Sequence, residues 1–132
     1  LIFGQLKPTM KPDLSNRTDI ETIVNTFYDK VKTDDTIGRF FTEVAKVHWE
    51  HHLPKMYVFW ENAVFYTGGY TGNIIEKHKG IHALSPLQPE HFQHWLKLFN
   101  ETVDELFEGE NANQIKQKAL SLATVIEIKV LN

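Results

Sequence analysis

Residues 89–107 read PEHFQHWLKLFNETVDELF and contain the clearest helical pattern in the chain. Apolar side chains recur there at steps of three and four, at Phe92, Trp95, Phe99, Val103 and Leu106. Such steps place side chains on one face of an α-helix. Pro89 suits a first helical turn, and Gly109 follows the last apolar residue. The segment therefore predicts an amphipathic helix with an aromatic stripe.

The segments around this helix repeat the pattern. Residues 113–130 carry apolar side chains at helical steps and predict a final helix. Their last part, VIEIKV at 125–130, would also suit a strand, but it prolongs the helical stripe, so we expect helix. Residues 74–81 predict a further helix that ends before Ser85 and Pro86. The C-terminal half thus contains three expected helices.

The N-terminal half begins with another helical pattern. Thr18 and Glu21 have the spacing of a capping box, in which the two side chains bond the free amides at a helix start. An apolar stripe follows at helical steps, at Ile20, Ile23, Val24, Phe27 and Val31. Residues 33–36 interrupt it, and IGRFF at 37–41 predicts a short turn that carries two phenylalanines inward. We expect one all-α domain over residues 18–132, after an N-terminal extension over residues 1–17.

Composition excludes several kinds of site and partner. The chain has 132 residues, enough for one domain, and no cysteine, which rules out disulfides and any cofactor attached through Cys-x-x-Cys-His. The formal net charge is −3 and the two signs are mixed along the chain, so the sequence does not predict the basic surface that nucleic-acid binding needs. It has no basic run and no long apolar stretch that would predict a membrane contact. We expect a cytoplasmic protein. Met10 offers an alternative native start, which would make residues 1–9 foreign to the natural chain.

Residues 48–60, HWEHHLPKMYVFW, are the richest in histidine and aromatic side chains. In a helix, Trp49, His52, Met56 and Trp60 would share one face. Pro54 costs about 3 kcal/mol in a helix interior but is tolerated in the first turn. We therefore expect the helix to begin near Leu53 and His52 to swing between a pocket and solvent.

Three further residues complete a constellation typical of an iron porphyrin site. His78 follows Ile74 by four residues, which places its ring on an apolar helix edge, and Tyr28 flanks the first apolar stripe. A neutral imidazole binds haem iron, while a phenol or the indole of Trp95 on the opposite face would contact a ligand. His82, one turn after His78, competes for the iron. Without cysteine, any haem must be held non-covalently.

The motifs together resemble those of the group III truncated haemoglobins over residues 18–130. They are FYDKV at 27–31, IGRFF at 37–41, Trp49-x-x-His52, Phe59-Trp60, Tyr70-x-Gly72, Lys77-His78 and WLKLF at 95–99. The resemblance implies a globin-like, two-over-two helical sandwich around haem b. The combination is far more specific than any single motif.

The resemblance also implies a role for each site residue. His78 would be the proximal iron ligand, Tyr28 and Trp95 the hydrogen-bond donors to a bound ligand, and His52 the swinging distal histidine. Phe41 would stack on the porphyrin. The other expected cofactor-binding residues are Phe27, Met56, Trp60 and Lys77, the last near a haem propionate.

Three functions fit these residues. The first is reversible, high-affinity binding of dioxygen, nitric oxide, carbon monoxide or cyanide. The second is enzymatic, a peroxidase-like or nitric oxide dioxygenase activity with His52 as proton carrier; the chain has no flavin- or nicotinamide-binding motif, so a separate reductase would be needed. The third needs no haem: His48-x-x-His51-His52 and His78-x-x-x-His82 have spacings seen in zinc or di-iron sites, but matching carboxylates are scarce.

Overall fold

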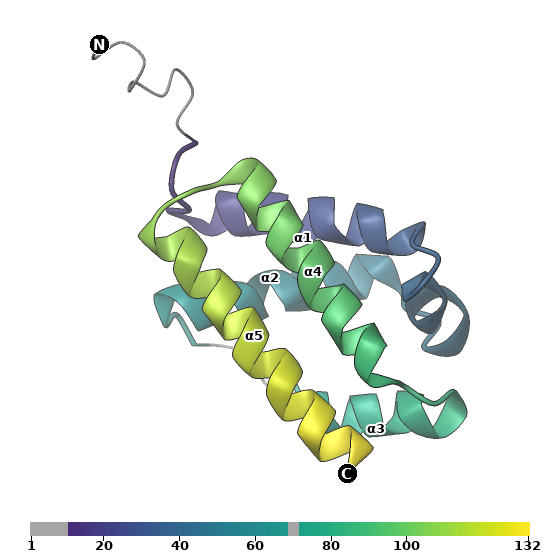
Figure 1. The fold of residues 1–132 in the computed structure, drawn as a ribbon. Coiled ribbons are helices and arrows are strands. Elements are labelled where there is room, and N and C mark those ends of the chain that lie inside the picture. The colour runs from purple at the N-terminus through teal and green to yellow at the C-terminus, as the bar shows by residue number, and fades with distance from the viewer. Residues whose placement is uncertain (1–10, 69–71) are drawn as a thin grey trace, which may run out of the picture.

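The computed structural model describes residues 11–68 and 72–132, and its helices form two layers (Figure 1). Helices α1 (Arg17–Lys32) and α2 (Trp49–Phe65) make one layer, and α4 (Pro89–Leu106) and α5 (Glu110–Leu131) lie over them. The described ranges contain no strand, so the all-α prediction is confirmed. The expectation for residues 1–9 and the Tyr70 part of the sequence motif lie outside the described residues.

Two smaller elements complete the fold. A π-helical turn, η2 (Phe40–Val44), lies between α1 and α2, where the sequence predicted a turn. Helix α3 (Ile74–Leu84) lies beside the last turns of α5 (Figure 1). Asn73 caps α3 through its side chain, which accepts a hydrogen bond from the amide of Glu76.

The main core lies between the two layers. Its largest fully buried side chains include Phe27, Ile20 and Ile23 of α1, Phe99 of α4 and Ile115 of α5. Full burial of one such side chain contributes about 1.5–3 kcal/mol. The helical stripe that the sequence predicted in residues 89–107 therefore faces the core through Phe99 and Val103, both 0% exposed.

The described end of the N-terminal extension packs onto this core. Leu14 is fully buried, and the carboxylate of Asp13 accepts hydrogen bonds from the amides of Asn111 and Ala112 at 3.0 and 2.9 Å. These amides belong to the first turn of α5, which has no acceptor within the helix for them. A side chain far away in sequence thus caps α5.

Two helix starts in the N-terminal half differ from the prediction. Asn16, not Thr18, caps α1: its side chain accepts from the amide of Asp19 at 3.0 Å, and asparagine is the stronger capping residue. Helix α2 begins at Trp49 rather than near Leu53, so Pro54 lies inside it. The carbonyl left without a partner is that of Glu50, an exposed residue, which water can satisfy.

The C-terminal helix also differs in extent. It begins at Glu110, three residues before the predicted start, and it includes residues 125–130, so the strand alternative is wrong. Apolar periodicity continues through these residues, with Ile126 and Val130 facing inward.

A second apolar cluster lies towards α3. It consists of Phe40, Leu87, Ile126 and Val130, with Ile74 and Ile81 of α3 packed against it. Helix α3 itself has no fully buried residue. The space between the two clusters is the candidate site.

Candidate functional site

A cavity of about 1010 Å³ opens between the main core and the second cluster, with members of both in its wall. Pockets for drug-sized ligands usually measure about 300–1,000 Å³, so this cavity can hold a large cofactor. Its aromatic lining residues are Tyr28, Phe40, Phe41, Phe59, Trp60, Phe92 and Trp95. A wall of this kind excludes water from most of a bound ligand's surface.

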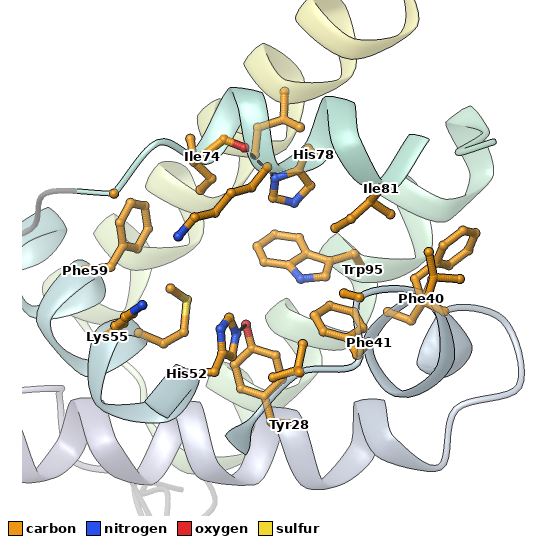
Figure 2. Close-up of a pocket in the computed structure, with 18 of the residues that line it drawn as sticks. Tyr28, Phe40, Phe41, His52, Lys55, Phe59, Ile74, His78, Ile81 and Trp95 are labelled. Carbon is orange, nitrogen blue, oxygen red and sulfur yellow. Dashed lines mark hydrogen bonds between the residues drawn. The ribbon is translucent and has the colours of Figure 1, made fainter. Parts of the chain in front are cut away.

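His78 points into the cavity from α3 (Figure 2). Its Nδ1 lies 2.7 Å from the carbonyl oxygen of Ile74, one turn earlier, so Nδ1 carries the proton and donates it. The other nitrogen, Nε2, then has a free lone pair. Burial lowers the pKa of His78 from its ordinary 6.5, although the bond to Ile74 opposes this shift. The ring of His78 is therefore neutral near pH 7, which is the form that binds a metal. Its Nδ1–H has the carbonyl partner that is typical of metal-binding histidines, and this leaves Nε2 for the metal.

His82, the competing histidine, has a different role. Its Nδ1 accepts a hydrogen bond at 2.9 Å from the amide of Leu87, in the connection after α3. It does not belong to the cavity wall. The structure therefore brings His78, and not His82, to the site.

Tyr28 and His52 lie across the cavity from His78 (Figure 2). The hydroxyl oxygen of Tyr28 lies 3.3 Å from Nε2 of His52, a long hydrogen bond whose direction depends on the tautomer of the ring. Burial, together with the positive charges of Lys77 and Lys55, lowers the pKa of His52 to about 4. A neutral imidazole and a phenol thus form a polar pair on the side of the cavity opposite His78.

Aromatic rings hold Tyr28 in place. Its ring contacts Phe27, Phe41, Trp49 and His52, with centroids 5.0, 5.7, 5.3 and 5.3 Å away. Edge-to-face contacts of this type add about 0.5–1.5 kcal/mol to burial. These contacts fix the direction of the ring and keep the hydroxyl beside His52.

Trp95 belongs to a second aromatic group. Its ring is parallel to that of Phe99, with centroids 5.4 Å apart and planes 9° apart, and Trp60 stacks on both. Phe27 meets Trp95 edge-on at 5.6 Å and also touches Tyr28. Phe27 therefore supports both cavity residues from behind and does not itself line the cavity.

The remaining predicted residues reach the wall, and two lysines that the sequence analysis missed join them. Phe41, Met56, Trp60 and Lys77 line the cavity, as do Lys46 and Lys55. No aspartate or glutamate occurs among the described lining residues. The wall thus combines apolar rings with positive charge, which suits an apolar macrocycle that carries carboxylate side arms.

The alternative of a multi-histidine metal site receives no support. Within residues 11–68 and 72–132, no three histidine, cysteine, aspartate or glutamate side chains come together as a metal would require. In the same ranges, no helix has the length and apolar character needed to cross a membrane.

Comparisons with known proteins agree with the fold and the cavity. The family model of the bacterial-like globins matches residues 13–128. The group 3 truncated hemoglobin ctb of Campylobacter jejuni subsp. jejuni is 31% identical over 118 residues, which cover 87% of this chain and 91% of that protein. The crystal structure of group III truncated hemoglobin from Campylobacter jejuni superposes with a TM-score of 0.79 and 30% identity, covering 92% of this chain and 95% of that one.

A two-layer helical fold around a largely apolar cavity, with a neutral histidine directed into it from α3, is typical of a globin. More narrowly, the chain belongs to the group III truncated haemoglobins within the bacterial-like globin family. The fold expected from the resemblance is confirmed. Membership implies a haem cofactor and the binding of diatomic gases. The cavity fits a haem, because the neutral ring of His78 can bind iron while apolar side chains and lysines surround the space.

Proposed function

We propose that this chain is a haem b protein that reversibly binds dioxygen, nitric oxide, carbon monoxide and cyanide with high affinity. One observation carries the proposal: His78, tied to Ile74 and directed into the cavity, faces the Tyr28 and His52 pair on the other side. His78 would hold a haem there, and the haem would supply an iron that can bind a small ligand.

His78 is the proximal ligand in this proposal. Its bond to Ile74 fixes the tautomer and the direction of the ring, so the free nitrogen points to one place in the cavity. Phe41 stacks on the macrocycle, and Met56 and Trp60 complete the apolar wall. Lys77 pairs with a propionate.

Tyr28 and Trp95 act on the bound ligand. A haem would supply an iron that binds small ligands and makes them partly negative, so the phenol of Tyr28 or the indole N–H of Trp95 would donate a partly charge-assisted hydrogen bond worth about 1.5–3 kcal/mol. Two such donors favour retention of the ligand over its release. His52 stays neutral at physiological pH and can accept from or donate to Tyr28.

The assignment of His78 is tested by its glycine variant. Protein reconstituted with haem should lose its histidine-ligated absorption spectrum in His78→Gly, because no other imidazole in the cavity wall has the same position, and added imidazole should restore it. His82→Gly is the matched control and should keep the wild-type spectrum. An unchanged spectrum in His78→Gly would refute the proposal.

The contact between Tyr28 and His52 favours a second function. A neutral imidazole 3.3 Å from a phenol can carry a proton to or from the ligand, which would help a peroxidase-like or nitric oxide dioxygenase reaction with an external reductase. Steady turnover of peroxide with an organic donor, far above that of free haem and reduced in His52→Leu, would support this function. Bleaching without turnover would exclude it.

A further inference from the structure

We propose that Asp34 and His94, which lie outside the cavity, form a positioning pair that fixes Trp95 relative to Tyr28 and so tunes ligand retention. Nε2 of His94 lies 2.8 Å from Oδ1 of Asp34, although the residues are 60 positions apart. The inference rests on the proposed function, because it assumes that Tyr28 and Trp95 both contact the bound ligand.

Asp34 connects three parts of the molecule. It follows the end of α1, the helix that carries Tyr28. Its Oδ2 accepts hydrogen bonds from the amides of Thr36 and Ile37 at 3.0 and 2.9 Å, at the start of the segment that brings Phe40 and Phe41 to the cavity. Its Oδ1 accepts from His94 of α4. One carboxylate thus links α1, the turn after it and α4.

The charge state of Asp34 supports this reading. Burial raises the pKa of this carboxyl, but hydrogen bonds from His94, Ile37 and Thr36 outweigh burial and lower the pKa below its ordinary 3.8. Asp34 is therefore an ionised acceptor near neutral pH, and His94 must donate from Nε2. The side chains of His94 and Asp34 are only 27% and 16% exposed, so water screens the bond little.

The hydrogen bond between His94 and Asp34 can affect Trp95 because His94 and Trp95 are neighbours in α4. His94 immediately precedes Trp95, so a shift of this helical turn along the axis of α4, or a rotation about it, moves the indole as well. Phe27 of α1 also meets Trp95 and Phe99 of α4 through ring contacts. Ring contacts allow small shifts in many directions, whereas a hydrogen bond near 2.8 Å fixes both distance and angle.

The test uses His94→Leu and His94→Gln. Leucine removes the donor, while the amide nitrogen of glutamine reaches about as far as Nε2 and restores it. In haem-loaded protein, His94→Leu should shift or split the C–O stretching band of the carbon monoxide complex and raise the dioxygen dissociation rate about two- to tenfold, the equivalent of weakening one hydrogen bond. His94→Gln should recover most of the wild-type band and rate.

A control separates positioning from general stability. The ion pair between Lys30 and Glu105, 2.7 Å long, also joins α1 to α4 but lies on the surface away from Trp95. Lys30→Gln should leave the C–O band and the dissociation rate unchanged. If His94→Leu lowers only the thermal stability and keeps the wild-type band and rate, the proposal is overturned.

The same experiment distinguishes failure of the proposed function. Tyr28→Phe and Trp95→Phe should each shift the C–O band by removing or altering a donor. If neither does, the assumed ligand contacts are wrong. If both do and His94→Leu does not, the ligand contacts stand and the positioning role alone fails.

Discussion

The hydroxyl of Tyr28 should hold bound dioxygen in place, and Tyr28→Phe removes only that atom. The side chain is 5% exposed and its ring is enclosed by other aromatic rings, so phenylalanine should keep the packing. The fold and the haem should therefore be unaffected. Any change in ligand release then reports the lost hydrogen bond.

The size of the effect follows from two opposing contributions. A charge-assisted bond from the phenol to the ligand is worth about 1.5–3 kcal/mol. To make it, the hydroxyl gives up its bond to His52, which is long at 3.3 Å. Such a weak neutral bond contributes about 0.5 kcal/mol, which leaves about 1–2.5 kcal/mol and a dissociation rate about five- to seventyfold faster in the variant.

The assay is stopped-flow displacement of dioxygen from the ferrous protein by carbon monoxide. Tyr57→Phe is the matched control: it removes the hydroxyl that contacts Asn25 between α1 and α2, outside the cavity wall, and should leave the rate as it is. A Tyr28→Phe rate within twofold of wild type would show that the phenol does not contact the ligand.

Two further predictions concern titrating groups. Asp13→Ala should lower the free energy of unfolding by about 1 kcal/mol near pH 7, because it removes the cap of α5. Burial raises the pKa of Asp13, but hydrogen bonds from backbone amides outweigh burial and lower this pKa below 3.8. In chemical denaturation, the difference in unfolding free energy between wild type and variant should therefore vanish as the pH falls through the lowered pKa, and a difference that stays constant would contradict the capping role. His52 should titrate near pH 4 in NMR spectra of the protein without haem. Between about pH 6.5 and 4 the unfolded chain binds the extra proton, so acid should weaken the fold, and a midpoint near 6.5 would contradict the burial of this ring.

Local periodicity explains why the helices were predictable. The stripe that includes Trp95 and Phe99 depends on residues three or four apart, and the structure needs no distant information to form it. Spacing also placed His78 on an apolar helix edge, one turn after Ile74. It did not separate His78 from His82, and the preference for His78 came from the family resemblance.

Contacts between distant residues were not predictable. Asp34 and His94 are 60 positions apart, and Asp13 and Asn111 are 98 apart, so no spacing rule joins them. In the sequence, Asp34 only marked the end of a helix. Its second role appears when α4 is packed over α1.

The error at Pro54 has a specific cause. Inside a helix, proline lacks the N–H that would bond the carbonyl four residues earlier, and its ring crowds the preceding turn, which is why proline more often begins a helix. In α2 this carbonyl belongs to exposed Glu50, and the amides of His51 and His52 bond to the carbonyl of His48. The helix thus forms ahead of the proline, and His52 is a regular helical residue.

Helix α3 has no fully buried side chain, and its isoleucines pack at the margin of the second cluster, beside the cavity. The four long helices already share a core without it. We therefore expect α3, the helix that bears His78, to be the least stable of these helices when the cavity is empty, and to gain apolar contact from a molecule that fills it. Bound haem would then stabilise α3, and we expect haem release to begin with local unfolding of this helix.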